Sequence, residues 1–298
     1  MQSVLITGGT GFIGRNLIPL LQKDNYKITV LSRNPALYQQ DFFFQHIDFI
    51  NDLSQLNSVD IVINLVGENL SNKRWSKEFK NTIKQSRIEN TIKLVDWMQS
   101  LEKTPHTFIS GSAIGFYGVR GNEDITENSD AGYAKEFQVR LCQDWEASAL
   151  RAQKYGIRTC IIRTGVVLGN DGALPKMLLP FKLGLGGKLG NGQQYFSWIH
   201  IQDHIAAIKH LINNNSLSGA FNLTAPNPVT NEQLTKTLGK IINRPTFANM
   251  PAFALKVIMG EMAEILLTGQ KVIPKKLQQS GFEFRFTDLE EALKDIIL

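Results

Sequence analysis

The sequence contains little cysteine and no long uninterrupted hydrophobic run. Its 298 residues include two cysteines, Cys142 and Cys160, and neither lies in a spacing typical of a metal site. We therefore expect two reduced thiols in the core. The longest apolar stretch near the C-terminus, residues 253–267, is interrupted by one lysine and two glutamates. This interruption argues against a membrane span and predicts a packed helix instead.

The sequence also lacks a large excess of positive or negative charge. The chain has 32 Lys and Arg against 27 Asp and Glu, and the resulting net charge of +5 is spread along the sequence in ones and twos. A nucleic-acid-binding face would show a denser basic stripe with interleaved aromatic residues, so we expect no nucleic-acid partner. The sequence enters its first expected strand at Ser3, without room for a charged and apolar leader, and this predicts a cytoplasmic protein.

Strand and helix patterns alternate over more than half of the chain. Short β-branched and apolar runs predict strands at residues 3–6, 27–31, 61–66, 107–109 and 158–162, with a weaker candidate at 42–47. Helical spacing of apolar residues covers residues 14–22, 77–99 and 136–155. Strands that alternate with helices form parallel sheets through right-handed crossovers. The sequence therefore predicts an α/β fold with a Rossmann-type doubly wound parallel sheet.

The strongest functional motif follows the first expected strand. Residues 7–14 read T-G-G-T-G-F-I-G, and glycines at 8, 11 and 14 allow a tight turn, a close approach to a pyrophosphate and close helix packing. Because the free N–H groups and dipole of a helix start attract phosphate, this unit predicts dinucleotide binding. An ordinary glycine-rich turn is the alternative interpretation.

The end of the second expected strand indicates which dinucleotide binds. Ser32 and Arg33 stand where an acidic residue would bind the ribose 2′-hydroxyl of NAD. An arginine there pairs with a 2′-phosphate instead, which favours NADP(H). The alternative is that Arg33 is a solvated charge at a strand end.

Composition changes after Gly165, where glycines gather up to Gly192. This segment is expected to be a lid over a ligand, or else a surface connection without a role. We therefore divide the chain into an NADP(H)-binding domain of residues 1–165, with later segments completing the sheet, and a smaller C-terminal substrate-side region of residues 166–298. Capping-box spacing at residues 230/233 and 287/290 predicts two helix starts in that region.

Further motifs are spread along nearly the whole chain. They are N-L-V-G-E at 64–68, R-W at 74–75, S-R at 86–87, F-I-S-G-S at 108–112, F-Y-G at 116–118, R-T-G-V-V-L-G at 163–169, W-I-H-I at 198–201 and G-Q-K-V-I-P-K at 269–275. With these motifs the chain resembles the extended short-chain dehydrogenase/reductases and nucleotide-sugar epimerases. The detailed match is to an atypical subgroup of epimerase-like proteins.

The resemblance implies a bound NADP(H). The residues that it assigns to the cofactor are Gly8, Gly9, Thr10, Gly11, Phe12, Ile13, Gly14, Ser32, Arg33, Leu65, Val66, Gly67, Glu68, Arg87 and Val166. The carboxyl end of the strand before Leu65 also lies where doubly wound sheets bind cofactors. Arg87 is either a phosphate clamp or an ordinary surface arginine on its helix.

The catalytic residues of the larger family are missing from this sequence. That family uses Ser or Thr together with a Tyr and a Lys spaced Y-x-x-x-K on one helix, where the lysine lowers the pKa of the phenol. Here Phe137 and Leu141 occupy the two helical positions, and Ala113 stands at the serine position. Tyr133 and Lys135 lie nearby, but they are two residues apart and so point to different sides.

Acid/base catalysis must then come from other residues, and our candidates are Ser112, Tyr117 and His200. A core tyrosine and a structural histidine are the alternative interpretations of the last two. His200 and His204 are four residues apart, but with no third ligand evident we predict no metal.

Two functional hypotheses follow. The first is an NADP(H)-dependent oxidoreductase or epimerase with an atypical active site, acting on a small carbonyl, hydroxyl or nucleotide-sugar substrate. The second is a non-catalytic NADPH-binding sensor or scaffold, which the loss of the Tyr and Lys pair suggests.

Overall fold

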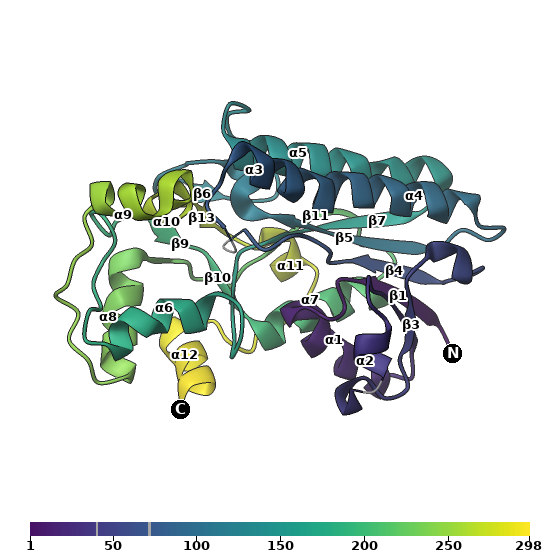
Figure 1. Cartoon of the computed structure of the whole chain (residues 1–298), viewed down its shortest axis with the longest axis horizontal. Coiled ribbons are helices and arrows are strands. Elements are labelled where there is room, and N and C mark those ends of the chain that lie inside the picture. The colour runs from purple at the N-terminus through teal and green to yellow at the C-terminus, as the bar shows by residue number, and fades with distance from the viewer. Residues whose placement is uncertain (40, 71–72) are drawn as a thin grey trace.

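A computed structural model describes residues 1–39, 41–70 and 73–298, and its centre is a seven-stranded parallel sheet (Figure 1). The strand order is β11-β7-β5-β4-β1-β2-β3, with every pair parallel. This order confirms the expected Rossmann-type fold. The strands are β1 Ser3–Thr7, β2 Lys27–Leu31, β3 Asp48–Ile50, β4 Ile61–Asn64, β5 Thr107–Ala113, β7 Arg158–Thr164 and β11 Gly219–Leu223.

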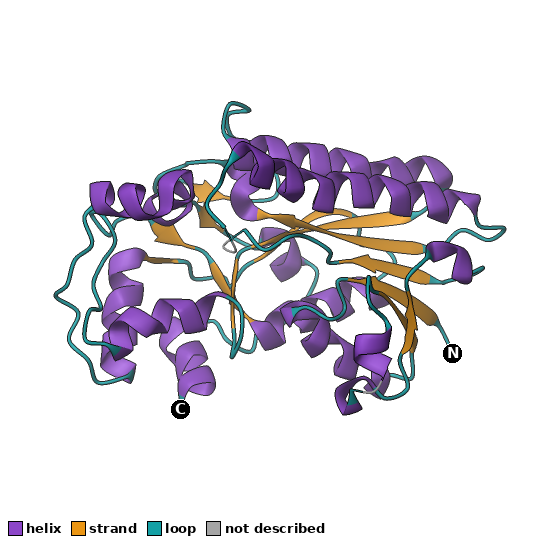
Figure 2. Ribbon diagram, viewed as in Figure 1, coloured by secondary structure: helices purple, strands orange, loops and turns teal. Residues whose placement is uncertain are grey.

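Helices cover both faces of the sheet (Figure 2). On one face lie α3 (Lys77–Lys84), α4 (Asn90–Ser100) and α5 (Phe137–Leu150), and on the other lie α1 (Phe12–Lys23), α7 (Ile201–Asn213) and α11 (Lys275–Gln279). Alternate residues of β1 point to opposite faces of the sheet. Val4 and Ile6 pack with α1 and α7, whereas Leu5 packs with α4. Strands buried on both faces are mostly apolar, as the sequence pattern predicted.

The remaining elements form a smaller region beside the carboxyl ends of the strands. It contains α6 (Ala173–Lys182), α8 (Asn231–Ile241), α9 (Ala252–Met259), α10 (Ala263–Leu267) and α12 (Leu289–Ile297). Three short strand pairs connect it to the rest: β8 (Val166–Leu168) with β10 (Trp198–His200), β9 (Tyr195–Phe196) with β12 (Val229–Thr230), and β6 (Asp124–Ile125) with β13 (Lys271–Val272). Much of its core is built from α6, α8 and α12.

The weak strand expected at residues 42–47 is wrong. A 3₁₀ turn occupies Phe42–Phe44, and the strand follows at Asp48–Ile50. The ring of Phe44 is buried against Tyr38 and Phe49, so burial of an aromatic cluster decides the local structure there. His46, with φ of +64°, turns the chain before the strand.

Two expectations for the C-terminal region also need correction. The helix predicted over residues 253–267 breaks at a 3₁₀ turn and is not packed throughout, since Phe253 is 74% and Val257 72% exposed. The cap of α12 is Asp288, which accepts from two backbone N–H groups, and not Thr287. By contrast, Thr230 and Gln233 form the predicted capping box of α8. No helix in the described ranges is long and apolar enough to cross a membrane.

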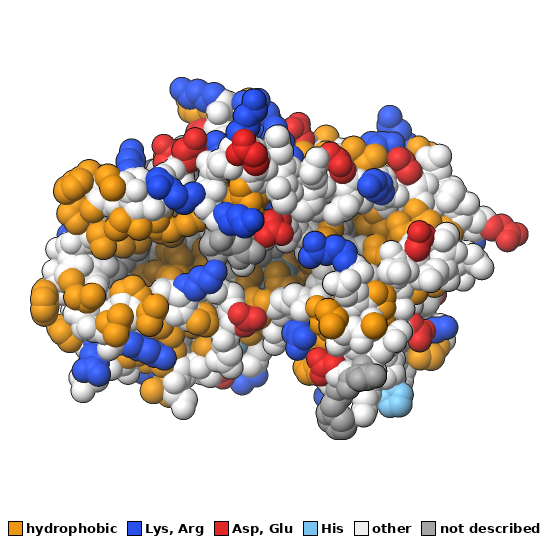
Figure 3. All heavy atoms as spheres, in the orientation of Figure 1, with side chains coloured by type: hydrophobic (Ala, Val, Ile, Leu, Met, Phe, Trp, Pro, Cys, Tyr) orange, Lys and Arg blue, Asp and Glu red, His pale blue; other side chains and the backbone are white. Residues whose placement is uncertain are grey.

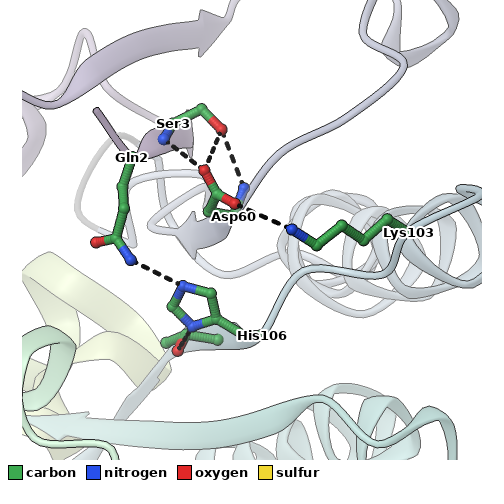
Figure 4. A network of polar contacts seen from close by, with 6 residues as sticks. Gln2, Ser3, Asp60, Lys103 and His106 are labelled. Atoms are coloured by element: carbon green, nitrogen blue, oxygen red, sulfur yellow. Dashed lines mark hydrogen bonds and ion pairs between the residues drawn. The ribbon is translucent and has the colours of Figure 1, made fainter.

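A polar network holds the amino ends of three strands together (Figure 4). Asp60, just before β4, accepts from the backbone N–H and the hydroxyl of Ser3, both at 2.9 Å. The backbone N–H of His106, just before β5, donates to the carbonyl of Asp60 at 3.0 Å. The Ser3 N–H is the main reason that the pKa of Asp60 lies below its ordinary value.

We expect Asp60→Asn to lower the free energy of unfolding at pH 7 by about 1–2 kcal/mol, because it removes a charged acceptor. A carboxyl with a depressed pKa stabilises the fold above its unfolded pKa, and this contribution is lost as the pH falls through the folded pKa. Urea denaturation at pH 7 and pH 3 should therefore show the difference from the wild type shrinking at low pH. Asp96→Asn, in an exposed pair with Arg151, is the control and should change little.

Candidate functional site

The turn between β1 and α1 forms as the glycine spacing predicts. Gly8 has φ of +74°, and a Cβ there would lie 2.8 Å from the carbonyl carbon of Leu65. A Cβ on Gly14 would lie 2.5 Å from the Cα of Gly9. Among the described residues no side chain caps α1 at Gly11, so the first N–H groups of the helix are available to a phosphate.

The backbone of Leu65 lies beside this turn because β4 is fixed at its end. The N–H of Leu65 donates to the carbonyl of Thr7 at 2.9 Å, and the Thr7 hydroxyl donates to Asn64 Oδ1 at 2.7 Å. Asn64 Nδ2 donates in turn to the hydroxyl of Thr91 on α4 at 2.8 Å. This buried amide therefore positions Leu65 next to Gly8, at the sheet edge where doubly wound folds bind nucleotides.

Arg87 holds the loop that follows Leu65. It lies in a π-helical turn, Gln85–Glu89, between α3 and α4, and its Nη2 donates to the carbonyl of Glu68 at 3.0 Å. A Cβ on Gly67 would lie 2.9 Å from the Arg87 guanidinium carbon. Burial lowers the pKa of Arg87. Two segments that carry expected cofactor residues, the loop after β4 and the π-helical turn, thus meet at Arg87.

The other expected cofactor residues flank the turn. Ser32 and Arg33 follow β2, and the Arg33 side chain is exposed without a hydrogen bond or ion pair to any residue in the described ranges. The ring of Phe12 lies against the glycine-rich segment, since a Cβ on Gly169 would be 2.6 Å from it. Val166 begins β8 and its N–H donates to the carbonyl of Ser197. That segment is not one long connection, because it contains β8 and α6.

Ser112 and Tyr117 belong to one buried polar network. The Ser112 hydroxyl donates to Glu146 Oε1 at 2.6 Å, and Arg163 binds both oxygens of Glu146 at 2.9 and 2.8 Å. Arg163 Nη1 also donates to the Tyr117 hydroxyl at 2.9 Å, and that hydroxyl donates to Asn222 Oδ1 at 2.7 Å. The structure therefore connects two of the three catalytic candidates through an ion pair.

The charges of this network are well compensated. Burial lowers the pKa of Arg163, but the hydrogen bonds and charge of Glu146 outweigh it, so that the pKa is raised overall. Burial also raises the pKa of Tyr117, against the opposing effect of Arg163. Nearby, burial raises the pKa of the Cys142 thiol to about 12, so this cysteine remains protonated.

Sequence reasoning missed Glu146 and Arg163 as site residues. Arg163 interrupts the apolar run of β7, and Glu146 lies on the buried side of α5. A charge of each sign on two elements that face the core is a signal for a buried pair, because neither is stable there alone. The same helix carries Phe137 and Leu141, and Leu141 is buried in an apolar cluster.

His200 lies outside this network as far as the described contacts show. Its Nδ1 accepts from the backbone N–H of Gln202 and so caps α7, while its Nε2 lies 3.3 Å from Asp295 Oδ2. Burial lowers the pKa of His200 to about 4, which leaves the ring neutral. His204 is directed elsewhere, because its Nε2 lies 3.1 Å from the Thr164 hydroxyl.

The face that carries the smaller region is hollowed between α9–α10 and α6–α8 (Figure 3). Hydrophobic side chains gather on both margins of the hollow. The exposed large hydrophobic residues of α9 and α10 are Phe253, Val257, Ile258 and Ile265, and those of α6 and the following turn are Leu179, Leu183 and Leu185. An open apolar surface of this kind is typical of a binding site.

The fold and the glycine turn define a Rossmann-type protein of the dinucleotide-binding class. The profile of the NAD dependent epimerase/dehydratase family matches residues 4–224, and that of a domain of unknown function, DUF1731, matches residues 250–296. The chain belongs to the NAD dependent epimerase/dehydratase family.

Three relatives cover almost the whole chain. The chloroplastic homolog of epimerase family protein SDR39U1 from Arabidopsis thaliana is 40% identical over 99% of this chain and 87% of its own length. Epimerase family protein YfhF from Bacillus subtilis is 36% identical over 99% of this chain and 98% of its own. The crystal structure of human epimerase family protein SDR39U1 with NADPH matches with a TM-score of 0.89 at 34% identity, over 99% and 98% of the two chains.

We expect Arg163→Met to lower the free energy of unfolding by about 3–5 kcal/mol, because it leaves Glu146 buried without its partner. The double variant Glu146→Gln/Arg163→Met removes both charges and should be more stable than Arg163→Met alone. Guanidinium denaturation of the single and double variants measures this coupling. Additive losses would show that the pair does not act as a unit, and Arg151→Met in its exposed pair is the control.

The depressed pKa of His200 gives a pH dependence of stability. Since the unfolded chain binds a proton near pH 6.5 and the folded ring only near pH 4, stability falls as the pH drops through this window. Asn at position 200 keeps a cap acceptor for α7 but cannot titrate. Urea midpoints measured from pH 7.5 to pH 4.5 should therefore decrease less in His200→Asn than in the wild type, and equal slopes would contradict this assignment.

Proposed function

We propose that the protein binds NADP(H) and acts as an oxidoreductase or epimerase on a small carbonyl, hydroxyl or nucleotide-sugar substrate. The observation that carries this proposal is the contact of the Gly8 turn with the backbone of Leu65, at the uncapped start of α1. Backbone N–H groups, a helix dipole and a glycine surface that admits a close approach are the requirements for a bound pyrophosphate.

The choice of NADP(H) over NAD(H) rests on Arg33. Its exposed guanidinium follows β2, and a bidentate bond to a 2′-phosphate would satisfy it. The human relative of known structure was crystallised with NADPH. Around the same site, Gly8 to Gly14, Leu65 to Glu68, Arg87 and Val166 are the proposed contacts of the dinucleotide.

Ser112 is the proposed proton-exchanging group, with Tyr117 in support. A bound nicotinamide exchanges hydride with substrate carbon, and a protein group must then exchange a proton with the substrate oxygen. Ser112 lies near the end of β5 with its hydroxyl on Glu146. Arg163 binds that carboxylate through two hydrogen bonds. Glu146 and Arg163 would therefore orient the Ser112 hydroxyl, as the lysine orients the tyrosine in the larger family. The substrate would lie in the hollow of Figure 3.

One observation favours the second candidate function, a cofactor sensor or scaffold. Tyr117 is fully buried and Ser112 only 5% exposed, and both hydroxyls donate inward to protein acceptors. Turnover assays with NADPH across carbonyl and sugar-nucleotide panels distinguish the two. Inactivity of a folded, cofactor-loaded sample against all of them would favour the sensor.

The cofactor proposal is tested with Arg33→Asp. This change removes a phosphate partner and adds a repelling charge. Affinity for NADPH should therefore fall about tenfold to a hundredfold, with a much smaller change for NADH. Isothermal titration and thermal shift with both cofactors measure it. Equal losses for NADPH and NADH would mean that Arg33 is misassigned, and a wild type stabilised by neither cofactor would overturn the proposed function.

A further inference from the structure

Arg15 connects the glycine turn to the crossover between β2 and β3. It lies on α1 directly after Gly14, and its Nε donates back to the carbonyl of Thr10 at 3.1 Å. Its Nη2 lies 3.7 Å from Asp41 Oδ2. The guanidinium carbon also lies 4.9 Å from the ring centroid of Phe44. Arg15 therefore contacts both its own turn, at Thr10, and a segment that begins 26 residues after it, at Asp41, near one edge of the sheet.

These two segments flank the place proposed for the adenosine ribose. Thr10 belongs to the turn that faces the pyrophosphate, and Arg33 follows β2, after which the chain leads through α2 (Ala36–Gln39) to Asp41. In Figure 1, α1 and α2 are both drawn below β1 to β3. A 2′-phosphate at Arg33 would thus lie in the same corner of the fold as Arg15.

Arg15 retains the capacity to bind an anion. Its Nε donates to the Thr10 carbonyl, whereas its Nη2 lies 3.7 Å from the Asp41 carboxylate, a distance too long for a hydrogen bond. Both side chains of the ion pair are about a third or more exposed, at 40% and 34%, so the pair contributes little to folding stability. A phosphate oxygen offers the guanidinium shorter and stronger bonds.

Asp41 has the opposite effect on the same ligand. Its carboxylate lies beside the Arg15 guanidinium and would repel a 2′-phosphate, whereas a ribose 2′-hydroxyl can donate to a carboxylate. The balance between Arg15 and Asp41 therefore affects the ratio of the affinities for NADPH and NADH more than it affects the affinity for the dinucleotide in general.

We propose that Arg15 is a second arginine of the 2′-phosphate site, and that Asp41 is its counterion, which the phosphate displaces. This inference rests on the proposed NADP(H) function and deepens it. Arg33 and Arg15 approach the phosphate from β2 and from α1, while Asp41 limits the affinity.

The test measures binding of NADPH, NADH, adenosine 2′,5′-bisphosphate and AMP by isothermal titration. For Arg15→Gln we expect NADPH and the bisphosphate to weaken about tenfold, the effect of one lost charge-assisted contact, with NADH and AMP changing less than about twofold. Asp41→Asn should tighten the two 2′-phosphate ligands about threefold or more. In the double variant this gain should be smaller, because only the direct repulsion between the Asp41 carboxylate and the phosphate remains to be removed.

Lys23→Gln is the matched control, since Lys23 is an exposed cation in the last turn of the same helix. It should leave all four affinities within about twofold, which separates a local contact from the general effect of net charge. Arg15→Gln should also reduce the salt dependence of NADPH binding, and Lys23→Gln should not.

Three results would overturn the inference. Equal weakening of NADPH and NADH in Arg15→Gln would show that Arg15 only supports the turn through Thr10. Unchanged NADPH affinity in Arg15→Gln, while Arg33→Asp loses it, would leave the proposed function intact and exclude Arg15. Weaker NADPH binding in Asp41→Asn would show that Asp41 positions Arg15 and does not oppose the phosphate. If the wild type bound none of the four ligands, the proposed function would fail as well.

Discussion

The site depends on a close approach of two backbones. Gly8 and Leu65 lie so near each other that a single Cβ would collide with the peptide after β4, so no side chain stands at the point where the loops after β1 and β4 meet. This approach requires the end of β4 to be fixed relative to β1. The buried Asn64 amide fixes it through hydrogen bonds with Thr7 and Thr91. Hydrogen bonds between the ends of β1 and β4 and helix α4 thus fix where the Leu65 backbone lies, because a buried amide must satisfy its partners in one geometry.

A second network, around Glu146 and Arg163, links α5 through three strands of the sheet to the segment between β13 and α11. It extends from Ser112 on β5 through α5 and β7 to Asn222 on β11. Asn222 then donates to the carbonyl of Ile273, beside α11. Buried charges of this kind add little net stability over apolar packing, but they define one arrangement of the elements that carry them. The position of the Ser112 hydroxyl is therefore coupled to the strand at the sheet edge.

The sequence was sufficient for the main fold and the nucleotide turn, because both follow from local patterns. Strands β1 and β2 begin where their apolar runs begin, and the glycines at 8 and 14 lie at the contacts that require them. The failures concern tertiary burial. Phe44 leaves a strand-like run to join an aromatic cluster, and Asp288 caps α12 in place of its neighbour Thr287. Glu146 and Arg163 form a pair across elements, which no local spacing encodes.

The edge strand β11 has a consequence for how the chain folds. It pairs with β7, and α7, which precedes it, covers the same apolar layer as α1. A ribosome-bound chain that has emerged only as far as β7 therefore exposes both an open strand edge and an uncovered hydrophobic layer. Such a nascent chain is a target for chaperones and for self-association until about sixty further residues have been synthesised. The sheet and the apolar layer of the nucleotide-binding half are thus completed only by α7 and β11.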